Sequence, residues 1–355
     1  MTSRSRTRNR GTGSHVPRFI VLVIVALAAC GSREVSNSER IERLLTLGKD
    51  VTILATDSGL GGMDITADLA ARMERSGVFR RARIVFFSAL FKERSGYNSL
   101  VKEADQLGIF DIVLAAMEEK YRPDLLLIGC NTLSVLYDKT AFARKPAFPV
   151  VGIVDAGIEL IARQFDQTPG ATALLFATRT TIDSHAHKAA LAGRGIPEDR
   201  VVEQVCDKLA GAVDRGPGSP ETVAMIRNFV AQALAKRPDP TTPVFASLNC
   251  TDYPLALEQF REALAAAGQP GIPVLNPNAR LSDFLFQPRF AGRFPSTEVT
   301  VEVVSKTVIE NEMLEAVGAI LRRIHPATSE AFLAYRHDPH LFEVDLDRVE
   351  FIRSK

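Results

Sequence analysis

Two cysteines stand in matching settings, where chemistry that uses a pair of thiols could take place. Cys130 follows the apolar run LLLIG, Cys250 follows FASLN, and a threonine comes shortly after each. Each cysteine is therefore expected at the end of a strand and the start of a helix, where the partial positive charge of the helix N-terminus favours the thiolate. Two thiols on opposite sides of one carbon would suit removal of a proton from one face and its return to the other.

Other polar residues follow further apolar runs. They are Asp57 and Ser58 with Gly59, Gly61 and Gly62, then Thr178 and Thr181, and finally Thr251 and Asp252 after the second cysteine. The glycines allow the first loop to approach a ligand closely. This loop is not a phosphate-binding loop, because its glycines are not followed by a lysine and a serine or threonine.

The sequence gives less support to a metal site or a Cys–His nucleophile pair than to a pair of acid–base thiols. Neither thiol has a CxxC partner, and the six histidines show no ligand spacing. His185 and His187 are expected at the surface, near a helix start, and a Cys–His pair with His185 would lack a third orienting group. Cys206 ends an apolar run and is expected to be a small buried side chain.

The elements that must position these residues alternate along the chain. Apolar, β-branched runs predict strands at 51–56, 83–88, 125–129, 150–154, 173–177, 201–205, 244–248, 272–275 and 299–304. Helical periodicity predicts helices at 64–75, 100–120, 156–165, 220–236, 254–267 and 308–323. Near-continuous apolar strands separated by helices indicate an α/β fold with parallel sheets, whose ligands lie beyond the carboxyl ends of the strands.

Composition narrows the class of protein. The chain has 355 residues, 46% of them hydrophobic and 24% charged, with 43 basic and 42 acidic side chains. This balance is typical of a packed globular protein, gives no reason to expect a nucleic-acid partner, and fits about two domains. Four cysteines are too few for a disulfide scaffold.

The first thirty residues resemble a targeting segment rather than part of the fold. An arginine-rich leader precedes the apolar run Phe19–Ala29, which is too short to span a bilayer. The ending Leu27-Ala28-Ala29-Cys30 resembles a bacterial lipobox, in which Cys30 is lipidated. The alternative is a buried helix with an incidental cysteine. We therefore expect a signal peptide at 1–30, a polar tether at 31–47, and a protein anchored in the bacterial cell envelope through a lipid at Cys30.

Three motifs together resemble a known family. The segments 57–62 (DSGLGG), 129–132 (GCNT) and 249–254 (NCTDYP) are similar, in order and spacing, to the signatures of glutamate racemase and the wider aspartate/glutamate racemase superfamily. The similarity extends over about residues 51–284, and the three motifs in order are far more specific than each alone.

This resemblance implies two pseudo-symmetric, doubly wound α/β domains with parallel sheets and an active site in the cleft between them. The first domain would span 48–150, completed by 272–324, and the second 151–271, with 325–355 unassigned. It also implies a cofactor-independent enzyme that inverts the α-carbon of a small acidic amino acid or dicarboxylate substrate, without metal. The implied catalytic residues are Cys130, Cys250, Asp57 and Asp252, and the implied substrate-binding residues are Ser58, Tyr97, Asn131, Thr132, Thr178, Thr181 and Thr251.

The chain also departs from the family. Asp252 stands where glutamate racemase has a histidine, and its charge is expected to raise the pKa of Cys250. Asn249 replaces the usual glycine, and only Tyr97 survives from the family's Pro-Tyr-Gly loop. Three functions stay open: an acidic-amino-acid racemase, another isomerase or decarboxylase of the superfamily such as a hydantoin-type racemase, and a ligand-binding lipoprotein without catalysis. A homodimer stays open as well.

Overall fold

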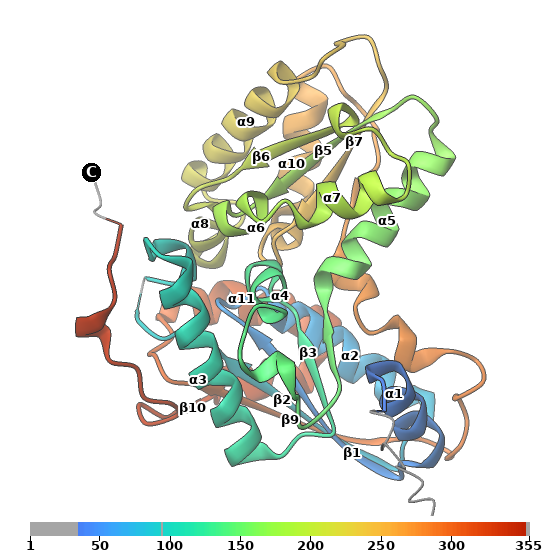
Figure 1. Ribbon diagram of the computed structural model, residues 1–355, viewed down its shortest axis with the longest axis vertical. Coiled ribbons are helices and arrows are strands. Elements are labelled where there is room, and N and C mark those ends of the chain that lie inside the picture. Colours follow the sequence, from blue (N-terminus) through green and yellow to red (C-terminus); the bar gives the residue numbers. More distant parts are fainter. Residues whose placement is uncertain (1–34, 94, 353–355) are drawn as a thin grey trace, which may run out of the picture. The chain divides into compact units, whose positions relative to one another are not determined.

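Two parallel sheets flanked by helices make up the computed structural model, which describes residues 35–93 and 95–352 (Figure 1). The strands of the first sheet run in the order β10 (Arg336–His337), β9 (Glu298–Ser305), β2 (Arg81–Ser88), β1 (Asp50–Asp57), β3 (Leu125–Ile128) and β4 (Val150–Gly152). Those of the second sheet run in the order β6 (Val201–Val205), β5 (Thr172–Ala177), β7 (Val244–Asn249) and β8 (Val274–Leu275). All these pairs are parallel, which confirms the predicted α/β class.

Helices follow most of the strands. They are α1 (Asn37–Leu47), α2 (Gly62–Ser76), α3 (Glu103–Tyr121), α4 (Asn131–Tyr137), α5 (Ile153–Gln167), α6 (Arg179–Asp183), α7 (Ala186–Gly193), α8 (Leu209–Arg215), α9 (Pro220–Ala235), α10 (Leu257–Ala266), α11 (Asn311–Ile324) and α12 (Pro326–Leu333). Short 3-10 turns are η1 (Tyr97–Ser99), η2 (Phe142–Arg144), η3 (Glu198–Arg200), η4 (Tyr253–Ala256), η5 (Pro277–Arg280), η6 (Asp283–Phe286) and η7 (Leu346–Arg348).

Each sheet is covered on both faces, as the apolar runs predict. In the first sheet, alternate strand residues such as Leu126 pack with α3, while Leu125 and Leu127 pack with α2. In the second sheet, Leu174 lies in the cluster with α9 and α10, and Leu175 in the cluster with α5 and α7. Because a strand alternates its side chains between faces, a strand buried on both faces reads as an unbroken apolar run.

Part of the predicted polar tether is a packed helix. The sequence prediction placed a tether at 31–47, but Asn37–Leu47 forms α1, and Leu45 is buried against the core of the first sheet. A capping box between Ser36 and Glu39 starts this helix, and the Asn37 amide bonds the backbone of Val150. The tether prediction is therefore corrected for these residues. The predicted signal peptide and Cys30 lie outside the described residues, and within the described part no helix is long and apolar enough to cross a membrane.

Two segments join the sheets differently from the sequence prediction. β8, expected to help complete the first domain, pairs with the free edge of β7, with Ala246 opposite Val274. The segment from 325 onward, left unassigned, forms α12 and adds β10 beside β9. In Figure 1 this red segment continues past α3, where Leu100 forms an isolated bridge with Phe351.

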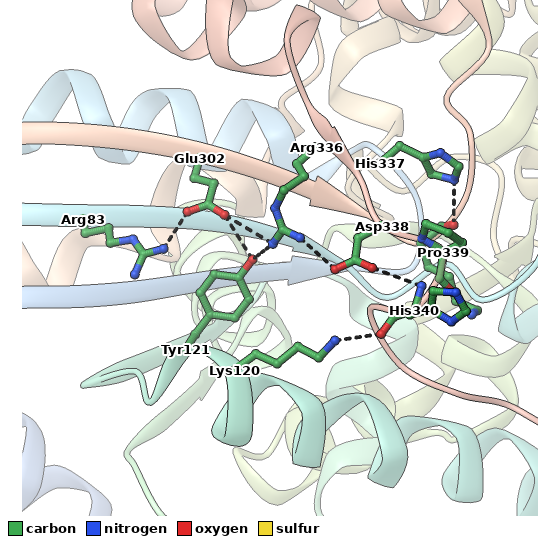
Figure 2. A network of polar contacts seen from close by, with 10 residues as sticks. Arg83, Lys120, Tyr121, Glu302, Arg336, His337, Asp338, Pro339 and His340 are labelled. Carbon is green, nitrogen blue, oxygen red and sulfur yellow. Dashed lines mark hydrogen bonds and ion pairs between the residues drawn. The ribbon is translucent and has the colours of Figure 1, made fainter.

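The C-terminal segment is held by buried apolar side chains as well as by charges. Leu341 and Phe342 are almost completely buried in the core cluster that contains α3. Figure 2 shows the polar network beside them, in which the Glu302 carboxylate accepts hydrogen bonds from Arg83 (2.6 Å) and the Tyr121 hydroxyl (3.1 Å). Arg336 contacts both Glu302 and the Tyr121 hydroxyl. Since the charged side chains of this network are 22–49% exposed and are partly screened by solvent, the apolar burial contributes most of the stability here.

Candidate active site

The predicted site residues lie at the carboxyl ends of strands in both sheets. Asp57 ends β1, Cys130 follows β3, Thr178 follows β5 and Cys250 follows β7. Direct hydrogen bonds join the two strand edges. The Thr251 hydroxyl donates to Asp57 Oδ2 at 2.6 Å, and the Thr132 and Thr178 hydroxyls are 2.8 Å apart. The structure therefore brings the predicted site residues of the first sheet together with those of the second sheet.

Burial favours the protonated form of Cys130. Its side chain is 5% exposed, and its Sγ lies 3.1 Å from the Ser58 hydroxyl. Burial, followed by the charge of Asp57, raises the pKa of this thiol well above its usual value, although Cys130 caps the N-terminus of α4. The expectation that the helix N-terminus favours a thiolate is therefore wrong for Cys130, because loss of hydration outweighs the helix dipole.

Cys250 has a carboxylate as its nearest polar partner. Its thiol donates to Asp252 Oδ2 at 3.3 Å. Burial first, and then the charge of Asp252, raise the pKa of Cys250 far above its usual value. The predicted like-charge effect of Asp252 is confirmed. Each thiol thus has one carboxyl neighbour that can receive its proton.

Four acidic side chains gather around the thiols. Asp57 and Asp252 were predicted from the sequence, whereas Asp64 on α2 and Asp214 on α8 were not. Burial is the main cause that raises the pKa of Asp57 to about 7 and that of Asp64 to about 8. It also raises the pKa values of Asp214 and Asp252. The cluster therefore holds protons at neutral pH that solvent-exposed carboxylates would have lost.

The glycine-rich loop and the second cysteine turn are in close contact. A Cβ atom at Gly61 would overlap the backbone of Thr251 and Asp252 and lie 2.6 Å from Asp252 Oδ1. Gly61 has an ordinary right-handed helical conformation, so the need for glycine here is one of space. Asn278 reinforces the contact, because its amide donates to the Thr251 carbonyl and to both carboxylate oxygens of Asp64.

Several buried polar groups near the thiols have no hydrogen-bond partner among the described residues. Both amide atoms of Asn131 are in this position, as is the hydroxyl of Tyr97. Tyr97 packs edge-on against Phe91 and Phe110, and burial is the main cause that raises its pKa. Buried polar groups without partners are rare in folded proteins, so they mark groups available to a ligand.

A chain of hydroxyls continues from these groups. Thr178 links Thr132 to Thr181, at 2.8 and 3.0 Å. Asn98, which the sequence analysis did not select, donates to Thr132 and accepts from the backbone of Thr180. Its position directly after the predicted site residue Tyr97 is the feature of the sequence that could have identified Asn98. These groups can bind carboxylate or ammonium groups.

The histidine prediction is wrong for His187. This side chain is 1% exposed, its Nε2 lies 2.9 Å from the Asn249 amide, and burial lowers its pKa to about 4. His185 caps α7 and is exposed, as predicted. Cys206 is buried, and Cys130, Cys206 and Cys250 are free thiols. In the described part of the chain, no three His, Cys, Asp or Glu side chains have an arrangement that could hold a metal ion.

Comparisons with known proteins agree with the motifs. The sequence profile of the Asp/Glu/Hydantoin racemase family matches residues 61–281. A glutamate racemase of Cereibacter sphaeroides is 31% identical over 66% of this chain and 86% of its own length, and one of Paracoccus denitrificans is 30% identical over 59% and 75%. The crystal structure of Francisella tularensis glutamate racemase in complex with D-glutamate has a TM-score of 0.57 at 19% identity, covering 81% of this chain and 95% of that one.

Proposed function

The chain belongs to the Asp/Glu/hydantoin racemase family and is an amino-acid racemase, and we propose that it inverts the α-carbon of glutamate or aspartate with two thiols and no cofactor. The observation that carries this proposal is the pair of buried thiols at facing strand ends, each beside a buried carboxyl group. One acid–base group for each face of a carbon is the minimum that inversion by proton transfer needs.

The proposed reaction begins with one thiol as a thiolate. Asp252 accepts the proton of Cys250, or Asp57 that of Cys130, so that an S–H bond breaks and an O–H bond forms. The thiolate then takes the α-proton, and the electron pair of the C–H bond stays on the substrate. The opposite thiol donates its proton to the other face. Hydrogen bonds from the Asn131 amide, the Thr132 hydroxyl and the backbone would stabilise the developing negative charge.

The charge of the site favours an amino acid over other substrates of the family. Asp57, Asp214 and Asp252 are buried and Asp64 is half-buried beside them, and Arg215 offsets part of this negative charge by lowering the pKa of Asp214. A substrate ammonium group would offset this negative charge, whereas a dicarboxylate without an amino group would add to it. The substrate's carboxylates would bind the amide of Asn131 and the threonine hydroxyls.

Proton exchange in D₂O tests the proposal. Leaderless protein is incubated with each enantiomer of glutamate and aspartate, and α-deuterium and enantiomer ratio are measured by NMR and chiral chromatography. We expect racemisation with one pair, and its loss in both Cys130→Ala and Cys250→Ala. Cys206→Ala is the matched control, because it removes a buried thiol whose hydrogen-bond partner is Gln204 rather than a carboxyl group. No exchange with any of the four compounds, or full activity in either site variant, refutes the proposal.

The cellular location is a separate part of the proposal. We propose that the enzyme is anchored in the cell envelope by a lipid at Cys30, on the strength of the basic leader, the apolar run and the small residues before this cysteine. Expression of the full chain should place activity in the membrane fraction, and Cys30→Ala should release it. Equal membrane association of both forms would contradict lipidation at Cys30.

A further inference from the structure

A second carboxyl group lies against Asp252 and comes from helix α8. Asp214 is 6% exposed, and a Cβ atom at Gly59 would lie 3.6 Å from Asp214 Oδ2 and 3.8 Å from Asp252 Oδ1. Both carboxyl groups therefore border the same space beside the glycine-rich loop. Each has a buried Oδ1 without a hydrogen-bond donor among the described residues. Two adjacent carboxyl groups can form a hydrogen bond with each other when one of them is protonated and donates to the other.

We propose that Asp214 is a positioning residue of the racemase site, whose protonated carboxyl donates a hydrogen bond to Asp252 and keeps Asp252 ionised as the acceptor for the Cys250 thiol. This inference rests on the proposed function. It defines a relay in which Asp214 and Cys250 both donate to one carboxylate. When Cys250 transfers its proton, the S–H bond breaks, its electron pair stays on sulfur, and the new O–H bond forms on Asp252.

The charges around Asp214 favour its protonated form. Burial is the largest cause of its raised pKa, followed by the charges of Asp252 and Asp57, and Arg215 on the same helix lowers it to a smaller extent. Helix α9 presents Glu221, which is 4.0 Å from Arg215 and largely exposed. Helix α11, which also packs on α8, carries the exposed Glu312 and Glu315. Exposed charges are screened by solvent, so the two buried aspartates dominate.

Two substitutions at this position should change different limbs of the pH profile of activity. Asp214→Asn keeps an N–H donor but cannot ionise. Activity should then be within a few-fold of the wild type at pH 7, and its alkaline limb should rise by about 1 pH unit or more, since the pair can no longer become doubly charged. Asp214→Leu removes the donor, so the pKa of Asp252 rises further. Its activity should fall about 10-fold or more at pH 7 and recover as pH increases.

A second readout needs no substrate. The rate of Cys250 alkylation by iodoacetamide, located by peptide mass spectrometry across pH 6–10, reports thiolate formation directly. Thiolate formation at Cys250 should move to lower pH in Asp214→Asn, which removes one buried charge, and to higher pH in Asp214→Leu, in which Asp252 has lost its hydrogen-bond donor. Glu221→Gln is the matched control, because it removes one exposed carboxylate from the neighbouring helix and should leave both profiles unchanged. Thermal melting verifies that each variant is folded.

The outcomes separate this inference from the proposed function. If acidic amino acids are turned over but both Asp214 variants keep the wild-type pH profiles, the carboxyl pair is refuted and the racemase stands. If no acidic amino acid reacts while the two alkylation profiles still diverge, the proposed substrate is refuted and the carboxyl pair stands. Equal loss of activity in both variants at every pH, with wild-type alkylation profiles, would reduce Asp214 to a packing role and overturn the inference.

Discussion

Gly61→Ala gives the sharpest test of how the two strand edges are held together. The added Cβ would overlap the backbone of Thr251 and Asp252, which cannot rotate away as a side chain could. Carbon atoms pack at about 3.5–4.0 Å, so the turn that carries Cys250 would have to retreat by about 1 Å. A displacement of this size at reacting groups can cost about 100-fold in rate, equivalent to about 2.7 kcal/mol of transition-state stabilisation.

The assay for this prediction is α-proton exchange of the substrate identified above, with kcat and KM measured separately. Gly59→Ala is the matched control from the same loop, because its Cβ would meet Asp214 and Asp252 only at ordinary van der Waals distances of 3.6 Å or more. We expect at most a few-fold loss for the control and about 100-fold for Gly61→Ala. If Gly61→Ala keeps kcat/KM within threefold of the wild type, the close contact is not part of the active arrangement and the reasoning fails.

Three further predictions concern binding, pH and stability. Asn131→Ala should raise KM by about 10-fold or more while hardly changing the melting temperature, because its amide has no hydrogen-bond partner among the described residues of the protein. The pKa of Asp57 rises to about 7 on folding, so its stabilising contribution is present below about pH 4 and is lost as pH rises towards 7. Urea unfolding should therefore show Asp57→Asn gaining stability relative to the wild type between pH 5 and 8, by at most about 4 kcal/mol, and an unchanged difference would contradict the raised pKa. Leu341→Ala should destabilise the protein by about 2–4 kcal/mol and Arg336→Ala by less than about 1 kcal/mol, and the reverse order in chemical denaturation would show that the network of Figure 2 holds the C-terminal segment.

The strands and the places of the two thiols could be read from the sequence because both follow from burial. Leu125–Ile128 is buried throughout, and such a run between helices indicates a central parallel strand. Polar residues that directly follow these runs must lie at the carboxyl edge of the sheet, which is where Cys130 and Cys250 lie.

Residues that tertiary packing brings to the site could not be predicted in this way. Asp214 is in a seven-residue helix, where an acid reads as an ordinary exposed side chain, and only the packing of α8 beside Asp252 buries it. His187 was expected at the surface for the same reason. Helix α1 was missed because the segment is polar, although Ser36 and Glu39 have the spacing of a capping box. β10 has two exposed residues and no periodicity to read.

The raised thiol pKa values connect the acids, the substrate and the proposed location. Burial favours the protonated form of both thiols, and since the thiolate is the form that oxidises, the protonated thiols resist oxidation. An ammonium group bound beside Asp57 and Asp252 would offset the negative charge that contributes to these shifts, and would lower both thiol pKa values when a substrate is present. On this reasoning the buried acids make thiolate formation depend on the amino group of the substrate. An enzyme exported to an oxidising compartment would thereby keep two opposed thiols reduced between turnovers and reactive within them.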